Sequence, residues 1–346
     1  MIINNYDIQI DSLVIHWVGN KNNDDGIILS KSEYELTEEI STILLKYFIS
    51  PIRYDELYEF THNSDIELNE VYNYVFKIFE NPKTIQEQSV LLANYLYENS
   101  KHPKIKSGEF YVAHFSNIEL DNRTIDAVGV FKSEKKDTFL DVYSDSVSFF
   151  IENKKGININ KLDKGCLIFN TKKESGYIVA VVDNTNKGAE AQYWIDDFLH
   201  VRQRQDEYYN TQNVLSLYKS FIKNELPQQF EVSKADQAEL INKSVQFFKE
   251  KDSFDLNEFA NEVIGNQEII EYFNGFKNQY QKERDVDIAD SFQISASAVK
   301  KGVRTLKSVI KLDKNFDIYI HGNSDLIEQG VDEKGKFYKV YYNEES

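Results

Sequence analysis

Residues 165–183 (GCLIFNTKKESGYIVAVVD) contain two apolar stretches that are separated by a short polar turn. Both stretches, 165–171 (GCLIFNT) and 176–183 (GYIVAVVD), are rich in β-branched and aromatic side chains, which favour strands. A parallel pairing would need a crossover of a dozen or more residues, usually a helix, and the connection here is much shorter. The stretch therefore predicts antiparallel strand pairing at the centre of the fold.

The segments before this stretch extend the same pattern towards the N-terminus. Turns containing Asn, Asp, Gly and Lys separate three more strand-like segments, at 109–119, 126–133 and 138–152. Earlier still, the pattern predicts a strand at 8–18 and helices at 32–48, 67–80 and 84–98. Ser32 and Glu35 have the spacing of a capping box at the start of the first helix, and Pro51 ends it.

From residue 189 the hydrophobic period changes to 3.6 and predicts a long helix up to about residue 225, which Leu226-Pro227 ends. Further helices are expected at 234–251, 255–264 and 267–283, and short strands at 308–312, 316–320 and 337–342. We therefore expect an α+β fold. A domain of residues 1–226 would hold the antiparallel sheet, its flanking helices and the long closing helix. A smaller domain, 227–346, would hold a helical segment and a small C-terminal β element.

Composition and charge narrow the possible functions. The chain is 41% hydrophobic with only 14 Gly and 4 Pro in 346 residues, which is typical of a folded protein and not of a disordered or collagen-like one. Its 40 Lys and Arg against 57 Asp and Glu give 40 − 57 = −17. An acidic chain repels phosphate, so any binding to DNA, RNA or anionic lipid must come from a local basic patch.

The single cysteine, Cys166, excludes an intrachain disulfide and a cysteine-based zinc site. It begins the apolar segment 166–169, so we expect a buried structural thiol. The first residues lack the pattern of a secretory signal, and no apolar run approaches the roughly 18 residues of a membrane span. A cytoplasmic protein without membrane contact is the expectation.

The common catalytic motifs are missing from the sequence, and its six histidines are scattered. We therefore expect no catalytic residues, no bound metal and no cofactor. The segment Gly330-x-x-x-x-Gly335-Lys336 resembles a phosphate-binding loop as far as its lysine. Phe337 then stands where Ser or Thr would be needed, so we interpret the segment as a β-turn.

A Mg²⁺-dependent nuclease is an alternative that the sequence leaves open. Asp121 or Asp126, followed by Glu134-x-Lys136, resembles the arrangement in which two carboxylates hold Mg²⁺ and a lysine steadies the attacking water or the phosphate. The residues 132–137 (KSEKKD) are also typical of a solvated turn between strands, which is the interpretation we favour.

The strongest local charge lies in residues 298–314 (AVKKGVRTLKSVIKLDK), where six cations and one anion give +6 − 1 = +5. Lys300, Arg304 and Lys307 would share one helix face if 296–307 is helical, although Gly302 weakens such a helix. A stripe of this kind could follow a run of DNA phosphates, whereas the alternative is a solvated face that balances nearby acids. The residues that we assign to DNA contact are Lys300, Lys301, Arg304, Lys307 and Lys311. The next candidates are Lys132, Lys135, Lys136, Lys154 and Lys155.

Several long blocks, in order along nearly the whole chain, resemble the bacterial nucleoid-associated proteins of the NdpA/YejK type, in a form like that of Bacteroidetes. The blocks are 100–110 (SKHPKIKSGEF), 129–134 (GVFKSE), 156–170 (GINI-NKLDKGCLIFN), 190–194 (EAQYW) and 307–322 (KSVIKLDKNFDIYIHG). Asp317 departs from the resemblance, since histidine is expected there. The resemblance implies a non-enzymatic, DNA-binding protein of the bacterial nucleoid, but it transfers no base-contacting residues.

The expected function is therefore binding of double-stranded DNA through phosphate contacts, largely without sequence preference, because nothing in the sequence identifies a reader of base edges. A second class is an acidic interaction module that acts near DNA, for instance on a topoisomerase or in a defence assembly. Association with a protein partner in the nucleoid and formation of a homodimer both stay open.

Overall fold

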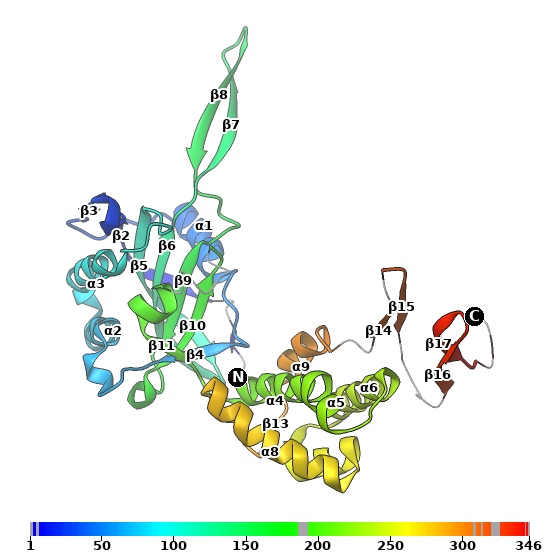
Figure 1. Cartoon of the computed structure of the whole chain (residues 1–346). Helices are drawn as coiled ribbons and strands as arrows, with labels where there is room; N and C mark the ends of the chain where they lie inside the picture. The colour runs from blue at the N-terminus through cyan, green and yellow to red at the C-terminus, as the bar shows by residue number, and fades with distance from the viewer. Residues whose placement is uncertain are drawn as a thin grey trace. The chain divides into compact units, whose positions relative to one another are not determined.

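The computed structural model describes residues 3–4, 7–185, 193–306, 309–312, 314–319, 326–342 and 344. The chain forms two compact units, Met1–Arg204 and Gln205–Ser346. The first unit is built on a large sheet with helices on both faces, and the second is mainly helical with small hairpins (Figure 1). The expected α+β class, with an antiparallel sheet and flanking helices, is confirmed.

Within the described residues, nine strands form the sheet of the first unit, in the order β11-β4-β10-β9-β6-β5-β2-β3 with β1 paired to β5. Every neighbouring pair in it is antiparallel. The strands are β1 Ile3–Asn4, β2 Gln9–Val18, β3 Ile27–Ile28, β4 Leu57–Phe60, β5 Gly108–Leu120, β6 Arg123–Ser133, β9 Lys164–Phe169, β10 Ile178–Asp183 and β11 Val201–Gln203. The described α-helices of this unit are α1 Glu38–Ile49, α2 Glu70–Glu80 and α3 Ile85–Asn99, and the π-helical turn η6 Ile195–Leu199 precedes β11.

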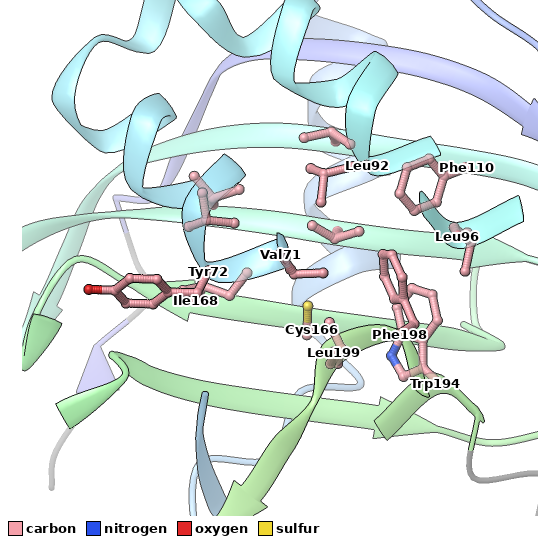
Figure 2. Close-up of a cluster of buried hydrophobic side chains, with 14 of the residues drawn as sticks. Val71, Tyr72, Leu92, Leu96, Phe110, Cys166, Ile168, Trp194, Phe198 and Leu199 are labelled. Atoms are coloured by element: carbon pink, nitrogen blue, oxygen red, sulfur yellow. The ribbon is translucent and has the colours of Figure 1, made fainter. Parts of the chain in front are cut away.

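Both faces of the sheet are buried, and strand alternation divides the core into two layers. Along β9, Cys166 and Ile168 point into the layer that α2 and α3 cover, whereas Leu167 and Phe169 point into the layer that α1 covers. Figure 2 shows the first of these layers, with the Cys166 sulfur among side chains that include Leu199 and Trp194. Because each strand residue faces one core layer or the other, the central strands are nearly continuous apolar runs.

Some local expectations for the first unit were wrong, and each has an identifiable cause. Helix α1 begins at Glu38, because the Thr37 side chain accepts the Ile40 amide at 3.3 Å and so caps it in place of Ser32. The single strand expected over 138–152 is a hairpin of β7 Asp137–Ser144 and β8 Phe149–Gly156. The long helix expected from residue 189 is interrupted, since β11 (Val201–Gln203) pairs with β4 as the edge strand of the sheet before the next helix starts.

The second unit is a helical bundle with small hairpins. Its helical segments are α4 Glu207–Ser220, the π-helical turn η7 Phe221–Glu225, α5 Leu226–Gln229, α6 Lys234–Glu250, α7 Leu256–Phe259, the π-helical turn η8 Ala260–Ile264, α8 Gln267–Arg284 and α9 Ala296–Val303. The hairpins pair β12 Ser253–Asp255 with β13 Ser291–Gln293, β14 Val309–Leu312 with β15 Phe316–Tyr319, and β16 Ile327–Asp332 with β17 Gly335–Val340. In the last hairpin Gly335 has φ +122°, a conformation that favours glycine, and the β-turn expected within 330–336 is the connection of residues 333–334 between the paired strands.

The two units divide between Arg204 and Gln205, whereas the sequence favoured a boundary after residue 226. The difference concerns α4, which was expected to close the first domain. Its side chains Val214, Leu217 and Tyr218 instead belong to the core of the second unit, together with residues of α6 and α8. Among the described residues, no helix is long and apolar enough to cross a bilayer.

Cys166 is buried in the sheet, as the sequence predicted. Burial raises the pKa of its thiol, and the thiolate is the form that reacts. We therefore expect Cys166 in the folded protein to react with a thiol reagent at least about a hundredfold more slowly than in the denatured protein, as followed by absorbance after addition of an aromatic disulfide. Equal labelling rates in the folded and denatured protein would contradict this burial.

His16 is a second buried group with a measurable consequence. Its Nδ1 accepts the Ser30 amide at 3.0 Å, so the ring proton sits on Nε2, which donates to Ser89 Oγ at 2.9 Å. Burial lowers the pKa of His16 from 6.5 to about 4, because a second proton would be desolvated and would face the Ser30 N–H.

A depressed pKa in the folded state means that stability is complete above pH 6.5 and is lost as the pH falls towards 4. His16 should account for a loss of about 3 kcal/mol across that window, from a shift of roughly 2.5 pH units at 1.36 kcal/mol each. Urea unfolding of His16→Gln at pH 7 and pH 4 should show a correspondingly smaller pH dependence than the wild type. The exposed His62→Gln serves as the control, and a His16→Gln variant with the wild-type pH dependence would contradict the assignment.

Candidate nucleic-acid interface

The basic segment chosen from the sequence begins on α9 (Ala296–Val303), a helix that Ser295 caps through its Oγ. The helix ends at Val303 because the amides of Thr305 and Leu306 turn back to the carbonyls of Gly302 and Val303. The expected helix over 296–307 is therefore too long. Lys300 and Arg304 remain one turn apart and exposed, whereas Lys307 lies outside the described residues.

Gly302 has a role that helix propensity alone did not indicate. A Cβ atom at this position would lie 2.6 Å from Cδ1 of Leu215 on α4. The missing side chain therefore lets α9 approach α4 closely. This packing holds the cations of α9 on a folded element and not on a loose loop.

The cations on and directly after α9 differ in whether another side chain of the protein already binds them. Lys301 Nζ donates to Tyr208 Oη at 2.9 Å and lies 5.5 Å from the centre of that ring, so this lysine is held against α4. Lys300 and Arg304 are exposed, and no ion pair ties either of them to an acidic side chain in the part of the chain that the structure describes. Of the three, Lys300 and Arg304 are the better placed for an external anion.

Lys311 on β14 is brought together with two lysines that the sequence analysis did not select. It lines a pocket of about 320 Å³ with Lys223 of η7 and Lys234 at the start of α6. The other described lining residues are Gln237, Ala238, Ile241, Val309, Ile310, Leu312 and Tyr338, and none of them is acidic. This group of Lys223, Lys234 and Lys311 is called the lysine pocket below.

The positive charges in and beside the lysine pocket repel one another, and this repulsion affects the pKa of Lys223. Burial lowers the pKa of Lys223, and the nearby charges of Lys219 and Lys234 lower it further. Lys234 Nζ donates to the neutral Gln237 Oε1 at 3.1 Å, so its charge is not neutralised by that partner. An incoming anion would relieve this like-charge repulsion. The pocket is therefore suited to phosphate or another multivalent anion.

The pocket and the cations of α9 share a structural neighbour. Helix α6 (Lys234–Glu250) packs against both α9 and β14. Ala235 and Ala238 of α6 form a small core with Ile310 of β14, which fixes the strand that carries Lys311. The sequence analysis did not select Lys223 and Lys234, because the segments around them have no unusual local charge. Only the tertiary packing of α6 against β14 brings these two lysines close to Lys311.

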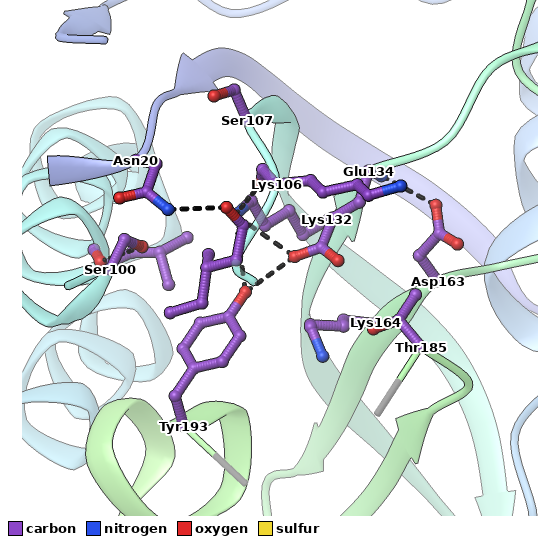
Figure 3. A network of polar contacts seen from close by, with 12 residues as sticks. Asn20, Ser100, Lys106, Ser107, Lys132, Glu134, Asp163, Lys164, Thr185 and Tyr193 are labelled. Carbon is purple, nitrogen blue, oxygen red and sulfur yellow. Dashed lines mark hydrogen bonds and ion pairs between the residues drawn. The ribbon is translucent and has the colours of Figure 1, made fainter. Parts of the chain in front are cut away.

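The second group of lysine candidates, in the first unit, is less available. Lys132 is fully buried, and its Nζ donates to the Lys106 carbonyl at 2.7 Å and lies 3.3 Å from Glu134 Oε1 (Figure 3). Lys136 pairs with Glu109 at 2.6 Å, and Lys154 pairs with Asp141. Lys132 is thereby excluded as a DNA contact. Lys135 and Lys155 remain exposed.

The proposed nuclease arrangement is not assembled. Asp126 is the fourth residue of β6 and Glu134 directly follows the last, so the two are eight residues apart, which at about 3.3 Å per residue is roughly 26 Å. The Glu134 side chain is 3% exposed and accepts from Tyr193 Oη at 2.7 Å, so it belongs to the buried network of Lys132 and not to a solvated turn. Asp163 Oδ2 accepts the amides of Glu134 and Lys135. Among the described residues, no three His, Cys, Asp or Glu side chains gather as metal ligands would.

The buried Lys132–Glu134 pair makes a stability prediction. Lys132→Met would leave the Glu134 carboxylate buried without its cation, which typically costs about 3–5 kcal/mol. We expect a loss of that size in urea unfolding, whereas the exposed Lys135→Met should change stability by less than about 0.5 kcal/mol. Similar small effects in both variants would show that the pair is not buried as described.

Comparison with known proteins agrees with the resemblance in the sequence. No curated protein sequence matches the chain closely enough to serve as a relative. A family model described as nucleoid-associated protein YejK matches residues 14–336, which include most of the large sheet, the three lysines of the pocket and α9. Because the match covers nearly the whole chain, the chain belongs to the nucleoid-associated protein YejK family.

Proposed function

We propose that this chain is a non-enzymatic protein of the cytoplasmic nucleoid that binds double-stranded DNA through phosphate contacts, largely without sequence preference. The observation that carries the proposal is the lysine pocket. Lys223, Lys234 and Lys311 come from three separate segments and line one cavity, whose described lining residues include no acid, in a chain whose net charge is −17. Membership of the family supports the same function.

The DNA contacts that we propose are those of Lys300 and Lys301 on α9, Arg304 directly after it, Lys311 on β14, and Lys307, which lies outside the described residues. Lysines suit this role because an ammonium group interacts with phosphate oxygens in any base sequence. Each neutralised phosphate releases counterions and adds about 0.9 to the slope of log K against log salt. Direct binding to DNA should therefore weaken steeply as the salt concentration rises, whereas a protein adaptor that does not contact DNA should show no such dependence.

The charge-reversal variant Lys300→Glu, Arg304→Glu, Lys311→Glu tests the assignment. We expect weaker binding to duplexes of unrelated sequence by similar factors, and a salt slope reduced by up to about 2.7, from three lost contacts of about 0.9 each. Fluorescence anisotropy of labelled duplexes, at several salt concentrations, measures both quantities.

The matched control reverses three exposed lysines of the first unit, Lys46→Glu, Lys77→Glu and Lys83→Glu. Both variants change the net charge by the same amount, −17 − 6 = −23, so a difference between them reports position and not total charge. Equal losses in both variants would contradict a local interface. Wild-type protein that binds no DNA at low salt would instead favour the acidic adaptor, and Mg²⁺-dependent plasmid nicking would contradict a non-enzymatic role.

A second pair of substitutions addresses the pocket itself. Lys223→Gln with Lys234→Gln removes two charges of the pocket and leaves α9 intact. We expect a smaller slope reduction, up to about 1.8. An unchanged slope would remove the pocket from the interface and leave only the cations of α9 and β14.

A further inference from the structure

The hairpin of β7 (Asp137–Ser144) and β8 (Phe149–Gly156) pairs with no other strand among the described residues and forms a two-stranded sheet of its own. It extends away from the large sheet of the first unit (Figure 1). We call it the arm. An isolated two-stranded hairpin is marginally stable in water unless a hydrophobic face is covered, so the arm's two faces need to be examined separately.

One face of the arm carries charges that are paired within it. Strand alternation places Asp141 and Tyr143 of β7 on the same face as Glu152 and Lys154 of β8. Lys154 pairs with Asp141, and Tyr143 Oη donates to Glu152 at 2.8 Å. Tyr143 also stacks on Phe150, with 5.5 Å between the ring centres. The Lys154–Asp141 and Tyr143–Glu152 pairs thus satisfy the polar groups of this face, whereas its rings Phe139, Tyr143 and Phe150 are 49%, 45% and 42% exposed.

The opposite face is apolar and open. Its central residues are Leu140, Val142, Phe149 and Ile151, which are 69%, 56%, 81% and 68% exposed. Val142 is directly opposite Ile151 across the strands, and the neighbouring cross-strand pairs are Leu140 with Asn153 and Ser144 with Phe149. These positions form an uncharged stripe, which ends at the base of the arm, where the exposed Lys155 lies opposite Thr138 on the same face. Large apolar side chains gathered at such exposure mark an interaction surface.

The chemistry of the stripe indicates which kind of molecule could bind to it. DNA is a poor candidate, because the stripe has no cation at its centre. A second copy of this chain is a suitable partner. In a twofold dimer the same face of both copies forms the interface, so residues of that face must pack against identical residues without repulsion. The apolar stripe meets this condition without bringing like charges together, even though each copy carries −17. The opposite face would bring Asp141 and Glu152 close to their own copies.

The area of the stripe sets the strength of such a contact. At roughly 100 Å² for each exposed apolar side chain, four of them offer about 400 Å² per copy and about 800 Å² for two copies. Strand backbone, Thr138, Asn153 and the tip residue Val147, which is 91% exposed, would add to this. The total approaches the lower end of specific interfaces, at about 1,200 Å².

We propose that the arm is a self-association element, through which two copies of this chain pack the stripe of Leu140, Val142, Phe149 and Ile151 face to face into a weak dimer. The contact is apolar, so it should resist added salt, in contrast to phosphate binding. The proposal stands apart from DNA binding and is tested on the protein alone.

The test compares two cross-strand pairs that are neighbours on the arm but lie on opposite faces. Val142→Thr with Ile151→Thr removes apolar surface from the stripe, and Tyr143→Thr with Phe150→Thr removes it from the charged face. Threonine is β-branched and keeps strand propensity, so the hairpin is retained. Sedimentation velocity from about 1 to 200 µM protein should show a dimer of micromolar dissociation constant for the wild type, since an interface of this size is at the weak end.

The stripe variant should raise that dissociation constant by about tenfold or more, and the charged-face variant by less than about threefold. A wild type that is monomeric up to 200 µM would overturn the proposal and leave the stripe for a different protein. Equal effects of the two variants, or no effect of either, would overturn the assignment to this face.

A chemical cross-link provides a second measurement on an otherwise wild-type surface. Cys166 is the only native cysteine and is buried, so Phe149→Cys introduces the only accessible thiol. A short bismaleimide should join two copies of Phe149→Cys, with a yield that persists from about 0.1 to 0.5 M salt. Tyr143→Cys on the charged face is the control. Equal yields at the two positions would contradict packing through the stripe.

Discussion

The strand β9 (Lys164–Phe169) lies between β6 and β10 and is buried on both faces. The architecture of the first unit depends on this burial, because both faces of the sheet must be covered. The residues of β9 alternate between two core layers, so each layer must have its own helical cover. Helices α2 and α3 cover one layer and α1 covers the other. Lys132 and Lys164, at one end of the central strands, are also fully buried, so their ammonium groups need partners inside the protein.

Burial of these lysines explains the polar network beside the sheet. Lys164 pairs with Asp183 at 2.7 Å, and Lys132 is held by Glu134 and the Lys106 carbonyl. Each ammonium group is compensated inside the protein, so neither is available to a ligand. The cations that we propose for phosphate contact lie instead in the second unit, at α9 and in the lysine pocket. A local group of cations is compatible with the acidic net charge of the chain, because exposed charges more than about 8 Å apart are largely screened at physiological salt.

Much of this fold follows from local pattern. The apolar alternation in 165–183 and 109–133 predicts the antiparallel sheet, and helical periodicity predicts α2, α3, α6 and α8 within a few residues. Contacts that are distant in sequence could not be predicted in this way. Thr37 replaces Ser32 as the cap of α1, and pairing with β4 makes a strand of Val201–Gln203 within an expected helix. The site shows the same limit, since charge density identified Lys300 and Lys311 but could not join Lys311 to Lys223 and Lys234.

The most direct test of the central claim is differential lysine acetylation of the wild-type protein, quantified by mass spectrometry with and without a duplex of random sequence. The account predicts that DNA protects Lys223, Lys234, Lys300 and Lys311, that high salt removes the protection, and that Lys46, Lys77 and Lys83 react equally in both samples. Protection that is uniform over both sets of lysines, or absent from the second unit, would contradict it.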